Sequence, residues 1–390
     1  MKIKKVSLRL PFSILGVMSL YYIFYFLGFS EKEGSDAGLP ILLLKIVSVA
    51  AFILLYFDWR SIFQKKRAVQ YILLIVVLWG LIFLVTKSLY LGQPDLKYFN
   101  LLLTLLPFCL LANRNQEVEV YTLLNSLVFV VSIQILIDIY IFINGFSLWE
   151  NNAFIGGVGN ANAFGFICNI CLSYLLYYKQ KSFHRYVLIV LISFGILFTV
   201  SMMSVLFMLL NFTLYFTRKN LLLTIIVLLT SIAVLFSTYE LLLPEHLKFK
   251  FESLLALLSG DTATGSRSVS LRVEIYNTFF ENIERATIHV IFFGYENIAY
   301  YIADSQYLTY IGSFGLLWSV CFFSLIFYYL YISIVKNKSF FWTVVFIQFV
   351  LFFFVNRALD YFPIGLILGL AISSGWHESK YDDSKVSLKT

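Results

Sequence analysis

Charged side chains are scarce in this sequence. Lys, Arg, Asp and Glu make up 13% of the 390 residues, whereas soluble domains carry about 25%. Hydrophobic residues make up 60%, and they form long continuous runs that do not alternate with polar residues. This absence of alternation argues against membrane-spanning strands. The composition therefore predicts an all-α integral membrane protein that crosses the bilayer many times.

Cysteine and histidine are also rare, with four residues of each. Cys168 and Cys171 form a C-x-x-C, which occurs in redox and metal sites, but here it lies in an apolar run without a second ligand pair. The histidines show no metal-ligand spacing, and the sequence has no Walker loop and no G-x-S-x-G motif. We therefore expect neither a metal nor a cofactor.

Twelve apolar runs predict about twelve transmembrane helices in a single polytopic domain, residues 1–390. The run over residues 186–217 is too long for one untilted span, so we divide it at 199–204, its most polar point. The expected spans are residues 10–29, 39–57, 69–86, 98–112, 118–143, 163–178, 186–200, 202–217, 221–238, 306–335, 339–355 and 359–374.

The positions of basic residues predict the orientation. With a cytoplasmic N-terminus, the inside segments carry 19 Lys and Arg and the short outside loops carry four. This bias predicts that both termini are cytoplasmic, with residues 375–390 as a cytoplasmic tail. Without the division at 199–204, later loops would change sides and the bias would disappear. The net charge of +7 lies mainly in these short clusters, so it does not indicate a nucleic-acid partner.

One loop, residues 239–305 between the ninth and tenth spans, is much longer than the others and is expected outside the cell. Residues 244–259 within it could form an amphipathic helix on the membrane surface. Further apolar residues recur at helical spacing, at Val269, Val273, Tyr276, Phe280 and Ile283. We therefore expect the loop to be a folded helical cap. We find no internal repeat, although many transporters are built from repeats.

The first of three polar clusters on the expected outer side is residues 149–166, which contain four glycines together with Asn160 and Asn162. The glycines allow a tight backbone, and the amides offer hydrogen-bond donors and acceptors. A Gly/Asn loop is also a common turn. Two charged residues, Asp138 and Lys45, lie inside apolar runs; such groups usually face a bundle or a cavity, and neither identifies a reaction.

The second cluster contains Arg267 and Arg272. Guanidinium groups suit phosphate oxygens, and two of them could grip a diphosphate. Alternatively, they are surface arginines paired with Glu274 or Glu281.

The third cluster is residues 294–318, in which Asp304 stands where the loop re-enters the membrane. Asp304 could be a general base or the N-cap of the next helix. Arg357 and Asp360 form a candidate ion pair on the same side.

In this order, the three clusters resemble the O-antigen ligase and polysaccharide polymerase (Wzy-like) superfamily. That family shows a G-N-P-N-type loop, an arginine-bearing segment in a large outer loop, and a short motif before a span rich in G-x-x-G. This sequence reads GNANAFG at 159–165, GSRSVSLRVEIY at 265–276, and DSQYL at 304–308 followed by GSFGLLW. Ala161 replaces the usual Pro, and Asp304 replaces the His of ligases, which favours a polymerase. The arginine of the family's S-R-G pattern is missing from SMMS at 201–204.

The resemblance implies a metal-independent membrane glycosyltransferase. It would polymerise undecaprenyl-diphosphate-linked repeat units into capsular, exo- or O-antigen-type polysaccharide at the outer face of the bacterial cytoplasmic membrane. Arg267 and Arg272 would stabilise the departing diphosphate, and Asp304 would accept a proton from the attacking sugar hydroxyl. The implied substrate-binding residues are Asn160, Asn162, Tyr276, Tyr307 and Arg357.

Beyond the lipid-linked glycan and membrane lipid, the partners implied are a chain-length regulator and a flippase. One alternative function is a ligase that transfers finished glycan to an acceptor. Another is a lipid-linked-oligosaccharide flippase or polysaccharide transporter. A flippase should show charges along a central path and two related halves.

Overall fold

The computed structural model describes residues 68–90, 120–146, 152–177, 182–217, 267–294, 305–335, 340–361, 364–365 and 367–369, together with residues 19, 22, 46 and 50. Of these residues, 87% are helical and none lies in a strand, in agreement with the all-α prediction. The predicted spans at 98–112 and 221–238 and the segment 244–259 lie outside the described residues. Two residues are described in each of the predicted spans at 10–29 and 39–57, and eight in the predicted span at 359–374.

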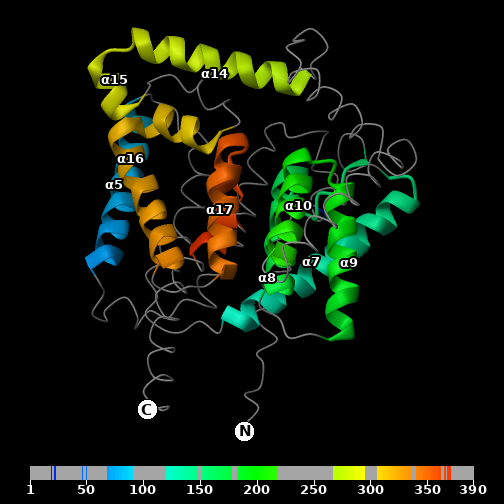
Figure 1. Cartoon of the computed structure of the whole chain (residues 1–390). Coiled ribbons are helices and arrows are strands. Elements are labelled where there is room, and N and C mark those ends of the chain that lie inside the picture. Colours follow the sequence, from blue (N-terminus) through cyan, green and yellow to red (C-terminus); the bar gives the residue numbers. More distant parts are fainter. Residues whose placement is uncertain are drawn as a thin grey trace, which may run out of the picture. The chain divides into compact units, whose positions relative to one another are not determined.

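Within these ranges, the apolar helices follow the predicted spans to within a few residues (Figure 1). Two windows, Leu124–Ile143 and Gln306–Tyr328, are long and apolar enough to cross a membrane. The number of spans and their orientation stay predictions. The apolar helices are α5 (Ala68–Tyr90), α7 (Val120–Ile143), α8 (Ala161–Tyr177), α9 (Phe183–Phe198), α10 (Met202–Thr217), α16 (Gln306–Val335) and α17 (Phe340–Val355).

The predicted division of the long run at 186–217 is confirmed, since α9 ends at Phe198 and α10 begins at Met202. Between them, Val200 has a φ of +53°. The Thr199 hydroxyl donates to Ile196 O (2.6 Å) at the end of α9, and the Ser201 carbonyl accepts from Val205 N in the first turn of α10. Hydroxyl side chains in the segment TVSMMS therefore accompany the change from one helix to the next.

Apolar side chains cover the exposed faces of these helices, whereas several polar side chains are buried. Such a surface is unusual for a soluble protein and is expected for helices surrounded by lipid. On α9 the exposed large side chains are Phe183, Tyr186, Val187, Val190 and Phe194. The buried polar residues of α7, α8 and α10 include Gln134, Asp138, Asn169, Ser173 and Asn211.

The helix predicted from Val269 onward is confirmed as α14 (Arg267–Arg285), followed by the short α15 (Ile288–Phe293). The predicted apolar face is slightly misplaced, because Phe279 is 2% exposed whereas Phe280 is 55% exposed. The residues of the less exposed face are Ile275, Tyr276, Phe279, Asn282 and Ile283.

The chain divides into two compact units, Met1–Val130 with Ile283–Thr390 (unit 1) and Val131–Asn282 (unit 2). Unit 1 contains α5, α15, α16, α17 and the 3-10 helix η3 (Ala358–Asp360). Unit 2 contains α8, α9, α10 and the larger parts of α7 and α14. In unit 2, α8 contacts both α9 and α10, which also contact each other. In unit 1, α16 contacts α5, α15 and α17.

The predicted span at 306–335 has the bounds of α16 (Gln306–Val335), but the prediction did not include an interruption of this helix. Gly315 has φ 84° and ψ 167°, so α16 is interrupted there, and Figure 1 shows its two parts meeting at a bend. The second part, residues 316–335, is about 30 Å long at 1.5 Å per residue, which matches the thickness of the hydrocarbon core.

Candidate functional site

The Gly/Asn loop of unit 2, residues 152–160, joins α7 to α8 through a backbone with several left-handed residues. Asn152, Gly156, Gly157 and Gly159 all have φ values between 55° and 81°. At Gly156, an added Cβ would lie 2.0 Å from the ring of Phe164. The loop is therefore a closely packed turn that requires glycine at position 156.

Asp138 of α7 holds this loop. Its carboxylate is 3% exposed, and its Oδ2 accepts hydrogen bonds from the backbone N–H groups of Ile155 (3.1 Å) and Gly156 (2.9 Å). Successive N–H groups beside a left-handed residue form a concavity that binds anions, and here a side chain of the same chain occupies it. These two amides are consequently engaged by Asp138, and this contact gives a structural role to a charge that the sequence left unexplained.

Asn160 has a helix-capping role in the structure. Its Oδ1 accepts from Ala163 N (2.9 Å), and its carbonyl accepts from Phe164 N (3.0 Å). This is the hydrogen bonding of a helix N-cap, so the amide oxygen of Asn160 stabilises the start of α8. Asn162 is half-buried in the first turn of α8. Substrate binding by either residue stays a prediction.

A chain of buried polar groups, which the sequence analysis missed, joins α8 to α10. Asn169 Nδ2 donates to Ser204 O (2.8 Å) and to Gly165 O (2.9 Å). The Ser173 hydroxyl lies 2.8 Å from Asn211 Oδ1, and Asn211 Nδ2 donates to Asn169 O (3.3 Å). Spacings of four residues on α8 (165, 169, 173) place these groups on one helix face, which is the only signal that the sequence offered.

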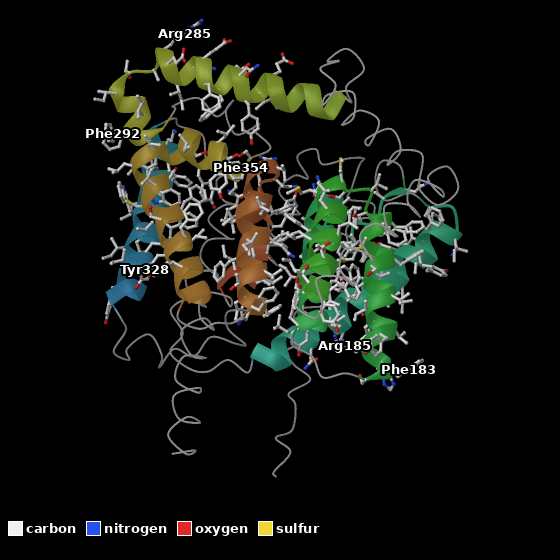
Figure 2. The ribbon with its side chains drawn as sticks, viewed as in Figure 1. Phe183, Arg185, Arg285, Phe292, Tyr328 and Phe354 are labelled. Carbon is white, nitrogen blue, oxygen red and sulfur yellow. The ribbon has the colours of Figure 1, made fainter. Side chains whose placement is uncertain are left out.

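Arg185, near the start of α9, extends these contacts. It is 3% exposed, and its Nη2 donates to Leu176 O (3.2 Å) and to the Tyr215 hydroxyl (3.4 Å). In Figure 2, Arg185 and Phe183 lie at the same end of α9. A cation at the C-terminal carbonyls of α8 is favourable, so Arg185 stabilises the α8–α9 hairpin in addition to any effect on orientation.

The two candidate arginines both belong to α14, in which Arg267 is the first residue. Their side chains lie outside the described part of the structure. At 3.6 residues per turn, positions 267 and 272 are about 140° apart around the helix. Position 272 is on the face of the buried Phe279, whereas position 267 is on the face of the exposed Glu274. The two arginines therefore do not share one face of α14.

In unit 1, three consecutive residues fix the start of α16 against the end of α17 and η3. The Ser305 hydroxyl donates to Phe353 O (3.2 Å), and the Tyr307 hydroxyl donates to Val350 O (3.1 Å). Gln306 Oε1 accepts from Leu359 N (2.8 Å). Figure 2 labels Phe354 at this end of α17. The predicted substrate ligand Tyr307 thus uses its hydroxyl proton in a contact within the protein.

Ser305 is the residue that caps α16. Its Oγ lies 3.5 Å from Leu308 N, and its carbonyl accepts from Thr309 N (2.9 Å). The sequence left open whether Asp304 was a base or the N-cap of this helix. Asp304 itself lies outside the described residues, so its role stays open; among the described residues, Ser305 contributes contacts at the start of α16.

Arg357 directly precedes η3 and is half-buried. Arg357 belongs to the same junction as Tyr307. Gln306, which precedes Tyr307, accepts a hydrogen bond from Leu359 N, two residues after Arg357. The predicted ion pair with Asp360 involves a side chain outside the described part of the structure.

The structure thus places Tyr307 and Arg357 in unit 1, and Asn160 and Asn162 in unit 2. The described residues contain no group of three His, Cys, Asp or Glu side chains that could hold a metal ion.

No protein-family model matches this chain, and no curated protein matches it significantly. The chemistry of the individual residues must therefore carry any assignment of function.

Proposed function

We propose that the protein is a multi-pass membrane glycosyltransferase that polymerises polyprenyl-diphosphate-linked oligosaccharide units at the outer face of the bacterial cytoplasmic membrane. The observation that supports this proposal most directly is the junction of Ser305, Gln306 and Tyr307 with α17 and η3, since two residues that the resemblance implies for substrate binding, Tyr307 and Arg357, belong to it. Exposed apolar helix faces support the membrane setting.

The reaction needs positive charge at the departing diphosphate, because negative charge develops there as the sugar–phosphate bond breaks. Position 272 lies on the less exposed face of α14, beside Tyr276 and Phe279 in the helical repeat. Position 267 lies on the helix face of the exposed Glu274. We therefore assign the main diphosphate contact to Arg272 and a weaker, outer contact to Arg267.

Attack on the donor then proceeds without a nucleotide or a metal. An acceptor sugar hydroxyl forms the new bond to the anomeric carbon, and the bond from that carbon to the diphosphate oxygen breaks. Asp304 takes the proton of the hydroxyl, and the diphosphate leaves with its electron pair on the polyprenyl carrier. The leaving group supplies the driving force, so no ATP is required on the outer side.

The interruption of α16 bears on the transporter alternative, because transporters often bind ions at unwound helices. Here the space beside Gly315 is filled by α15: a Cβ at Gly315 would lie 2.2 Å from Phe292 O and 2.6 Å from Phe293 N. This break therefore packs two protein segments together, which favours the enzyme over a transporter.

The arginines provide the test. We expect Arg272→Lys to reduce polymer formation by about 100-fold or more, the loss typical of removing a donor at a developing negative charge, because lysine lacks the planar guanidinium fork. Arg267→Lys, the matched control on the other face, should retain most of the polymer. The measurement is the size of carrier-linked glycan by mass spectrometry, at equal amounts of protein in the membrane.

Wild-type polymer with Arg272→Lys would remove the diphosphate role of that residue. Long chains that remain on the carrier would indicate a ligase, and single units trapped on the inner side would indicate a flippase.

A further inference from the structure

We propose that Asp138 is a positioning residue that fixes the Gly/Asn loop as a hydrogen-bond acceptor and does not carry protons. An ionisable residue inside an apolar helix often marks a proton or ion pathway. In this chain, however, the Asp138 carboxylate is engaged with the loop that follows α7. The inference rests on the proposed function where polymer is measured. The anchoring of the loop by Asp138 can be tested without measuring polymer.

The geometry of the contact favours a fixed acceptor. Both backbone donors, Ile155 N and Gly156 N, reach the same oxygen, Oδ2, at 3.1 and 2.9 Å. Ile155 is fully buried, so water cannot replace the carboxylate there. The two amide donors therefore fix the position of Oδ2 relative to the loop.

The loop is held on its other side as well. Phe154 N donates to Phe198 O (2.9 Å), the last residue of α9, and the Phe154 ring packs against the Phe198 ring with centroids 5.1 Å apart. Asp138 therefore joins α7 to a segment that also contacts the end of α9. The same segment leads, within a few residues, to the Asn160 cap and to Asn162. Release of the loop from Asp138 would consequently displace the start of α8.

Both hydrogen bonds to the loop end on one oxygen, so an asparagine can supply the same acceptor to Ile155 N and Gly156 N. Its single amide oxygen can take the position of Oδ2, whereas it cannot shuttle a proton at neutral pH. Leucine has a similar size but offers no acceptor. We expect Asp138→Asn to keep polymer formation within about threefold of wild type and Asp138→Leu to lower it more than tenfold. A proton carrier would instead lose activity in both variants.

A second readout reports the loop itself. Ala153 is 7% exposed and Phe146, before the loop, is 56% exposed. Single cysteines at these positions, in full-length protein lacking the native cysteines, are labelled with a soluble maleimide in native membranes. We expect the maleimide to label Ala153→Cys several-fold faster in the Asp138→Leu protein than in proteins that have Asp138 or Asp138→Asn. Labelling of Phe146→Cys should be equally fast in all three proteins.

Loss of polymer in Asp138→Asn with unchanged labelling would overturn the proposal, because it would show that the acidic group itself is needed. Wild-type labelling and polymer in Asp138→Leu would overturn it as well. Where the Leu variant does not reach the membrane, the Asn variant still decides. If cells with the wild-type protein make the same carrier-linked glycan as cells without it, but the labelling pattern holds, the anchor stands and the proposed polymerase function fails.

Discussion

Substitution of Gly315 by alanine tests the packing of unit 1. With φ 84° and ψ 167°, Gly315 occupies a backbone region that is essentially restricted to glycine, and a side chain there costs about 1–3 kcal/mol in strain. The added Cβ would also lie 2.2 Å from Phe292 O and 2.3 Å from Phe292 C. Because these are backbone atoms, α15 must move away from α16, at a further cost of about 1–3 kcal/mol.

Gly145→Ala is the matched control. Gly145 has a φ of +73°, but no atom lies within 4 Å of its added Cβ, so only the backbone strain of about 1–2 kcal/mol applies. For a chain of 390 residues, one kcal/mol shifts Tm by roughly 1 °C. We therefore expect Gly315→Ala to lower Tm by about 2–7 °C and Gly145→Ala by about 1–2 °C.

The assay is thermal unfolding in detergent micelles, followed by tryptophan fluorescence at one fixed scan rate, because unfolding of such proteins is often irreversible. Equal shifts for the two variants would refute the crowding argument, and no shift for Gly315→Ala would show that α15 does not occupy the break.

Two further predictions concern the α8–α10 contacts and the orientation of the chain. Asn211→Ala removes interhelical hydrogen bonds to Asn169 and Ser173, and at about 0.6 kcal/mol each it should lower Tm by about 1–2 °C. Combined with Asn169→Ala the shifts should be less than additive, and full additivity would argue against a shared network. A cysteine at Ser259 should react with an impermeant reagent on intact cells and a cysteine at Ser339 should not; the opposite pattern would invert the predicted topology.

Local features of this chain could be predicted from its sequence. Continuous apolar runs bounded by polar residues gave the ends of α8, α9, α10 and α17 to within a few residues, because helix formation in such segments depends on neighbouring residues. The division at 199–204 was visible for the same reason, since hydroxyl residues favour helix ends. The helical spacing from Val269 likewise predicted α14.

Contacts between distant segments could not be predicted in this way. Asp138 looked like an isolated charge because its partners, Ile155 N and Gly156 N, are backbone groups that any residue carries. The break in α16 was missed because Gly315 lies in an otherwise apolar run, and its close approach to the backbone of Phe292 joins segments that are distant in the sequence. Ser305 and Asp304 are both good capping residues, so their neighbouring positions left the cap unassigned.

The central claim is that the protein joins lipid-linked units into polymer with Asp304 as the base. Asp304→Asn keeps the size of the side chain but cannot accept the proton, so the most direct measurement is the size of carrier-linked glycan extracted from cells that contain only this variant. Our account predicts that single repeat units accumulate on the carrier at the outer face and that polymer is absent. Normal polymer in the Asn variant would contradict the role of Asp304. Long chains that remain on the carrier and are not transferred to an acceptor would contradict the polymerase function itself.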